Sequence, residues 1–96
     1  MKRPEFDRYG YPTDRTLRAI AQWPSEDFKG LMDFVESAWK YPDYWVQHGQ
    51  EICASTGGWS GNESLIEALS ENRVFWLMCW MQSRRGGHYI FVLPKE

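Results

Sequence analysis

A glycine-rich stretch at residues 57–63 is the first place where this sequence could do chemistry. It reads Gly-Gly-Trp-Ser-Gly-Asn-Glu and precedes a predicted helix, so its backbone N–H groups are suited to hold an anion. It lacks the lysine of a phosphate-binding loop, does not match the dinucleotide-binding pattern, and carries the negative charge of Glu63. Ser60 and Glu63 instead have the spacing of a capping box, which explains both residues without a ligand. Capping does not explain Trp59, and we therefore expect its side chain to contact a partner.

The second candidate is residues 84–88, Arg-Arg-Gly-Gly-His. The glycine pair predicts a tight hairpin, because glycine readily adopts the positive φ angles of such turns. Two arginines at a hairpin tip can bind phosphate or carboxylate groups in bidentate fashion. The alternative is a solvated turn whose arginines pair with acidic residues of the same chain, and such surface pairs contribute little to stability.

Few residues are suited to catalysis or metal binding. A small enzyme centred on Ser60, Glu63 and His88 is one alternative, but no spacing links these three residues as a known catalytic triad. The only other histidine and the two cysteines are His48, Cys53 and Cys79, and their spacing matches no compact zinc pattern. We therefore expect no metal and no cofactor. The two cysteines are predicted to be reduced core thiols within apolar stretches, with a single disulfide as the alternative.

Length and composition indicate one folded domain over residues 1–96. Aromatic residues make up 17% of the chain, more than a small core requires, which favours an aromatic binding surface. The net charge is −2, and its distribution is uneven. Residues 1–18 contain five basic and three acidic residues, residues 19–72 contain two basic and nine acidic residues, and residues 73–96 contain four basic residues and one acidic residue. A strong non-specific nucleic-acid binder would show a basic excess, which is missing.

The turn and cap signals predict an α+β fold. Residues 1–12 are predicted to be an extended arm, followed by a helix capped by Thr13 that ends before Pro24, and by a second helix capped by Ser25. Strands are expected at 44–47, 51–56, 74–82 and 88–93, with a third helix after the glycine-rich stretch. The order is α-α-β-β-α-β-β, which favours an antiparallel sheet of four strands, made from two hairpins, packed against three helices.

The predicted strand at 74–82 is apolar on both faces. Alternation places Phe75, Leu77, Cys79 and Met81 on one face and Trp76, Met78 and Trp80 on the other. One face would pack on the helices. The other would need the N-terminal arm, a helix of the chain or another protein to cover it.

The stretches 55–63, Phe75-Trp76 and 83–89 together resemble small uncharacterised proteins of bacteriophages and prophages. The resemblance covers roughly residues 55–93 and implies no catalytic role. It implies an accessory phage protein that acts in a bacterial cytoplasm by binding a host or phage macromolecule. A cytoplasmic location is also expected because the N-terminus lacks the apolar stretch of a signal peptide, and the longest apolar run, 74–81, is too short for a membrane helix.

These observations lead to one expected function and two alternatives. The first is a non-enzymatic protein that binds a host or phage protein, or a second copy of itself, with a surface made of Trp59, Arg84, Arg85, His88 and Tyr89. This expectation requires the glycine-rich stretch and the hairpin tip to lie close together. The alternatives are a nucleic-acid-binding module that uses the same arginines with ring stacking, and the small enzyme described above. No membrane partner is expected.

Overall fold

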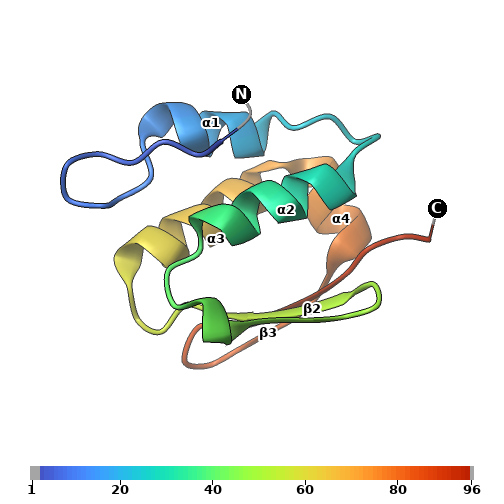
Figure 1. The fold of residues 1–96 in the computed structure, drawn as a ribbon. Helices are drawn as coiled ribbons and strands as arrows, with labels where there is room; N and C mark the ends of the chain where they lie inside the picture. Colours follow the sequence, from blue (N-terminus) through green and yellow to red (C-terminus); the bar gives the residue numbers. More distant parts are fainter. Residues whose placement is uncertain (1–2, 96) are drawn as a thin grey trace.

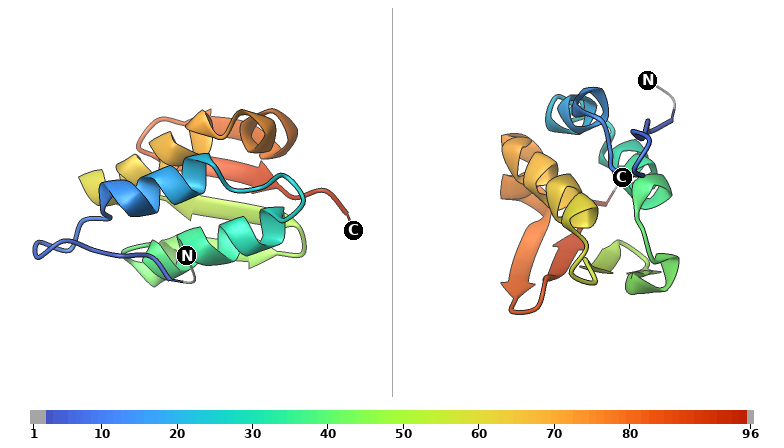
Figure 2. Two further views of the ribbon diagram at one scale, coloured as in Figure 1. Left: turned by 90° about the horizontal axis from the view of Figure 1, so that it is seen from above. Right: turned by 90° about the vertical axis from the view of Figure 1, so that its left-hand side faces the viewer.

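The computed structural model describes residues 3–95, which form a layer of helices on one face of an antiparallel sheet (Figures 1 and 2). The predicted α+β fold is therefore confirmed. Residues 1–2 of the predicted arm and residue 96 lie outside the described part. The elements are α1 (Asp14–Ala21), α2 (Phe28–Ala38), the 3-10 turn η1 (Pro42–Tyr44), β1 (Trp45–His48), β2 (Glu51–Ser55), α3 (Ser60–Glu71), α4 (Arg73–Cys79), β3 (Trp80–Arg84) and β4 (His88–Val92).

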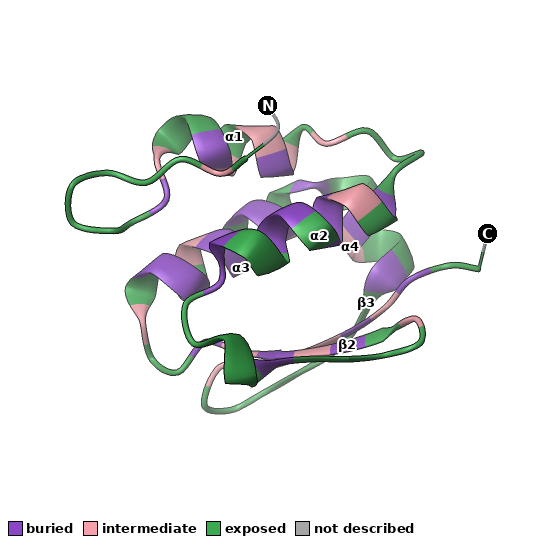
Figure 3. Cartoon of the chain, viewed as in Figure 1, coloured by how far each residue is buried: buried purple, intermediate pink, exposed green. Residues whose placement is uncertain are grey.

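The four strands lie in the order β1-β2-β4-β3, and each neighbouring pair is antiparallel. The inner face of the sheet is apolar and packs on the helices, through the buried side chains of Trp45, Ile52, Ala54 and Phe91. Figure 3 shows burial concentrated on the sides of the helices that face the sheet. No helix of residues 3–95 is long and apolar enough to cross a membrane.

The first two helices begin where local hydrogen bonds satisfy their free N–H groups. Thr13 caps α1 as expected, because its side chain accepts a hydrogen bond from the backbone N–H of Thr16. For α2 the expected cap, Ser25, is wrong. Asp27 caps this helix instead, because its carboxylate accepts the N–H of Gly30 at 3.0 Å.

The capping box expected at the start of α3 is also wrong. The N-cap residue is Trp59, which makes no side-chain capping bond, and Ser60 is already the first residue of the helix. The backbone N–H of Glu63 donates to the carbonyl of Trp59, so the first turn closes through the main chain. Ser60 and Glu63 are both exposed, and neither is needed to begin the helix.

The main correction concerns residues 74–79, which form most of helix α4 and not a strand. The helix begins at a buried Asn72, whose Oδ1 accepts the N–H of Phe75 while its Nδ2 donates to the carbonyls of Ile20 and Trp23. The two faces expected from strand alternation therefore do not exist. Helical spacing instead buries Phe75 and Cys79, and β3 begins only at Trp80.

Candidate binding surface

Thr56, the residue immediately before the glycine-rich stretch, is in direct contact with the tip of the last hairpin. The backbone N–H of Thr56 donates to the carbonyl of Gly87 at 3.0 Å. Gly87 has a φ of +80°, and a Cβ at this position would overlap the Thr56 hydroxyl. The proximity that the sequence-based hypothesis required is therefore present between these two loops.

Asn62 holds the glycine-rich stretch against the segment that follows α2. Its side chain is fully buried, accepts the backbone N–H of Lys40 at 3.0 Å, and donates to the carbonyls of Lys40 at 2.9 Å and Thr56 at 3.2 Å. A buried amide with three such bonds fixes the backbone on both sides of it. Lys40 is consequently brought next to Trp59, which lies 19 residues further along the chain.

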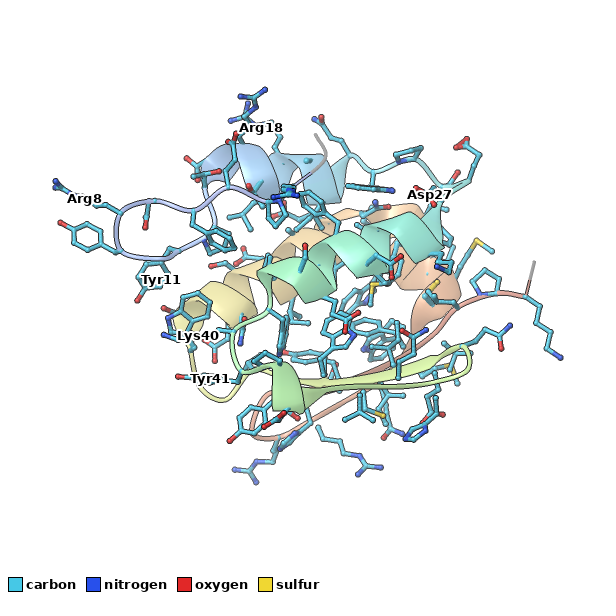
Figure 4. The ribbon with its side chains drawn as sticks, viewed as in Figure 1. Arg8, Tyr11, Arg18, Asp27, Lys40 and Tyr41 are labelled. Carbon is cyan, nitrogen blue, oxygen red and sulfur yellow. The ribbon has the colours of Figure 1, made fainter. Side chains whose placement is uncertain are left out.

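Trp59 lies between the N-terminal arm and Lys40. Its ring packs over Gly61, where a Cβ would overlap the indole, and stacks on Tyr11 with ring centroids 5.2 Å apart and planes 21° apart. The Lys40 ammonium lies 4.8 Å from the Trp59 centroid, a cation–π distance. Figure 4 shows Tyr11 and Lys40 at the same end of the molecule. Trp59 is therefore held in place within the domain and only partly open to solvent.

Two tyrosines extend this cluster, and the sequence analysis did not single them out. The Lys40 ammonium is also 5.6 Å from the ring of Tyr41, whose centroid lies 5.6 Å from that of Tyr44. Gly57 adopts a φ of +64°, and a Cβ there would press on both tyrosine rings. We call the rings of Tyr11, Trp59, Tyr41 and Tyr44 the aromatic row. Tyr41, which precedes Pro42, adopts a φ of +67°, whereas a residue before proline normally has the negative φ of extended backbone. The Tyr-Pro pair therefore did not predict this conformation.

The tip arginines are exposed and do not pair with the acidic middle of the chain. Arg84 donates from Nε to Gln82 at 3.3 Å, and Arg85 is open to solvent. Within residues 3–95 the ion pairs are Arg15–Glu5 and Lys29–Asp33, and both lie on other elements. The guanidinium groups are thus available for carboxylates of another molecule.

His88 and Tyr89 point to opposite faces of the sheet. His88 lies opposite Arg84 on β3 and Ser55 on β2, and its Nδ1 shares a 2.7 Å hydrogen bond with the Ser55 hydroxyl. Tyr89 faces the helices, half-buried, with its ring 6.5 Å from that of Phe91. The structure thus brings Arg84, Arg85 and His88 together at the tip and turns Tyr89 towards the core.

Ser60, Glu63 and His88, the residues of the enzyme alternative, do not form a hydrogen-bonded set within residues 3–95. None of the hydrogen bonds within residues 3–95 links His88 to Ser60 or Glu63, and His88 is bonded to Ser55 instead.

Both cysteines are free thiols. Desolvation, with a hydrogen bond to Glu51, raises the pKa of Cys53, and burial raises the pKa of Cys79 to about 11. A raised pKa disfavours the thiolate, so neither cysteine is activated as a nucleophile.

The described residues contain no group of three or more His, Cys, Asp or Glu side chains placed to hold a metal ion. In comparisons with known proteins, no family model, no curated protein and no solved structure matches the chain.

Proposed function

We propose that this protein binds another protein through the aromatic row and the arginine tip. The observation that carries the proposal is the Thr56–Gly87 hydrogen bond, because it joins the loop that leads to Trp59 to the hairpin that carries Arg84 and Arg85. Aromatic and arginine side chains supply most of the binding energy in protein interfaces. Here they occupy adjoining loops at one end of the domain.

The exposure of the row supports binding over a purely structural role. Tyr41 is 41% exposed, Tyr44 is 48% exposed and Tyr11 is 39% exposed, although these rings contact one another or neighbouring groups. Tyrosine offers a large contact area at a small cost in side-chain entropy, since it has only two χ angles. Cation–π contacts to Lys40 hold part of the row in place before a partner arrives.

The charge around the row favours a protein over a nucleic acid. Lys40, Arg84 and Arg85 are accompanied by Asp43 next to Tyr44 and by Glu63 one turn into α3. Such a surface suits a protein partner that carries both positive and negative charges. Binding to a phosphate backbone would instead require a continuous row of basic residues. Following the resemblance to phage and prophage proteins, we place the partner among the host or phage proteins of a bacterial cytoplasm.

The test is a pull-down from bacterial lysate with the tagged full chain, with and without nuclease. Tyr44→Ala and Arg85→Ala remove exposed side chains from the surface, and Lys29→Ala, on α2, is the matched exposed control. The proposal expects a nuclease-resistant protein that the control retains and that both surface variants capture at least about tenfold less. A partner captured equally by all variants would place the binding surface elsewhere. Loss of every partner after nuclease treatment would favour the nucleic-acid alternative, which a steep decrease in binding with salt would then support.

A further inference from the structure

The outer face of the sheet, on the side away from the helices, carries a polar row at the end where the last hairpin turns (Figure 2). Ser55 of β2 lies opposite His88 of β4, and His88 lies opposite Arg84 of β3. Three neighbouring strands therefore place a hydroxyl, an imidazole and a guanidinium next to one another on the same face. We call these three residues the polar row.

The first two members of the polar row are joined by a hydrogen bond, because Ser55 Oγ and His88 Nδ1 are 2.7 Å apart. Buried residues fix the backbone beneath this pair. The indole N–H of Trp39 donates to the Ser55 carbonyl at 3.1 Å, and the N–H of Thr56 donates to the Gly87 carbonyl at 3.0 Å. Side chains held on strands in this way are in place before a ligand arrives, which lowers the entropy lost on binding.

The Ser55–His88 pair keeps a hydrogen to donate in both neutral forms of the imidazole. Where the Ser55 hydroxyl donates to Nδ1, the ring proton lies on Nε2 and is free. Where Nδ1 donates to Ser55 Oγ, the hydroxyl hydrogen is free instead. A Cβ at Gly86 would lie 3.4 Å from Nε2, so the glycine leaves the space beside this nitrogen open. The pair can therefore donate to a ligand in either tautomer.

The guanidinium of Arg84 acts on the same part of the face. Its Nε donates to Gln82 at 3.3 Å, and no ion pair within residues 3–95 includes Arg84, so its two terminal nitrogens remain for a ligand. Desolvation and Glu51 raise the pKa of Cys53, and the positive charge of Arg84 opposes this rise. Cys53 lies on β2, two residues before Ser55, so the charge of Arg84 acts across β4 on the strand that carries Ser55.

From this arrangement we propose that Arg84, His88 and Ser55 bind a phosphate monoester group carried by the partner protein. The inference rests on the proposed function, because the arginine tip belongs to the proposed surface, and it names the chemistry of the partner. A phosphate monoester has three acceptor oxygens and a charge of about −1.5 to −2 at neutral pH. Donors from three strands suit its tetrahedral shape, and Arg84 and Arg85 supply two positive charges.

Carboxylate and phosphodiester groups suit the polar row less well. A carboxylate is planar with two oxygens, which a single guanidinium binds in bidentate fashion without His88 or Ser55. The phosphodiesters of a nucleic acid carry one charge each and bind along an extended row of basic residues. The outer face instead carries Glu51 on β2, and the net charge of the chain is −2. A phosphate monoester is the group that uses all three donors together.

The first test is a titration of the purified full chain with inorganic phosphate at constant ionic strength, followed by two-dimensional NMR. We expect saturable shifts of the His88 ring, the Arg84 side chain and the Ser55 amide. Arg84→Gln and His88→Gln should each weaken binding at least about tenfold, because each variant removes a hydrogen bond to a charged group. Both residues are exposed, so the variants should keep the circular dichroism of the parent.

The matched controls are His48→Gln, at the opposite end of the outer face, and Arg15→Gln on α1, and both should bind phosphate like the parent. A titration without saturable shifts in the polar row overturns the proposal. Acetate that binds as tightly as phosphate at the same ionic strength also overturns it. So does an oligothymidylate that binds more tightly than phosphate and loses its binding in Arg84→Gln, because the site would then serve nucleic acid.

The second test determines whether the partner carries the phosphate group. Treatment of the lysate with a broad-specificity phosphatase before the pull-down should reduce capture of the partner at least about tenfold, whereas heat-inactivated phosphatase should leave capture unchanged. Capture that resists phosphatase but is lost in Tyr44→Ala and Arg85→Ala overturns the phosphate site and leaves the proposed binding surface in place. Binding of inorganic phosphate without any captured protein supports the phosphate site, and it overturns the proposed function together with the partner as the source of the phosphate.

Discussion

Thr56 and Gly87 meet through a 3.0 Å backbone hydrogen bond, and a Cβ added at Gly87 would overlap the Thr56 hydroxyl. This contact connects β2 and the glycine-rich stretch to the tip of the β3–β4 hairpin. The proposed binding surface depends on it, because the loop that leads to Trp59 and the arginines of the tip come from segments about 25 residues apart in the sequence.

Gly87→Ala should be much more destabilising than Gly86→Ala. Both glycines have positive φ, so either substitution introduces backbone strain of about 1 kcal/mol. Only at position 87 does the added methyl group also collide with Thr56, which should raise the cost to about 2–4 kcal/mol. Urea unfolding of the two variants measures the difference. Equal free energies of unfolding would mean that the loops do not pack as described.

Asn62→Ala should destabilise the domain by about 2–4 kcal/mol, because it leaves the N–H and carbonyl of Lys40 without their partner and removes one of the two hydrogen bonds to the Thr56 carbonyl. Ser60→Ala, two residues earlier, should change stability by less than about 0.5 kcal/mol, since Ser60 caps nothing. Thermal unfolding of the Asn62→Ala and Ser60→Ala variants measures both changes in stability. A large loss of stability in Ser60→Ala would mean that Ser60 does cap α3, contrary to the structure.

Thr16→Val should release the N-terminal arm. The Thr16 hydroxyl is fully buried, accepts the N–H of Glu5 at 2.8 Å and donates to the Glu5 carbonyl at 3.1 Å. We expect hydrogen exchange of the Glu5 amide to accelerate at least about tenfold and stability to fall by about 1–2 kcal/mol.

Arg15→Ala is the control for this experiment, because it removes only the exposed 3.9 Å ion pair to Glu5. Such a pair contributes little, so exchange at the Glu5 amide should stay near the parent rate. Faster exchange in the Arg15 variant than in the Thr16 variant would show that the ion pair, and not the buried hydroxyl, holds the arm.

Stability should fall as the pH rises from 9 towards 11, in part because of Cys79. Burial raises the pKa of this thiol to about 11 in the folded state, whereas the ordinary value of 9.0 applies to the unfolded chain. Between these values the unfolded chain binds fewer protons than the folded one, so alkaline pH favours unfolding. Cys79→Ala should flatten this part of the profile of unfolding free energy against pH. A profile identical to that of the parent would contradict the prediction.

Thiol labelling is an independent measurement of the burial of Cys79. A thiol-specific reagent should modify Cys53 in the folded protein, because Cys53 is partly exposed. It should modify Cys79 only when the domain opens, because Cys79 is buried. A Cys53→Ser variant should therefore react at a rate that follows the opening of the domain and rises with denaturant.

The tight turn of the last hairpin and one of the three expected helix caps could be predicted from the sequence. The Thr13 cap and the turn at Gly86-Gly87 appear where expected, and both glycines of this turn adopt positive φ. The caps expected at the start of α2 and α3 were wrong. These features depend on residues close together in the chain, so the α+β class followed from them. The contribution of Trp59 to a binding surface was also a prediction from local pattern.

Only the tertiary structure decided the conformation of residues 74–79 and the faces of the last hairpin. An uninterrupted apolar run carries no period that separates a helix from a strand, and the deciding contact, from Asn72 to the carbonyl of Ile20, spans 52 residues. Likewise, the register with β2 sets His88 on the outer face beside Ser55 and turns Tyr89 inwards. Neighbouring residues point to opposite sides of a strand, so the sequence alone determined that His88 and Tyr89 would separate. Packing against the helices determined which of the two would face solvent.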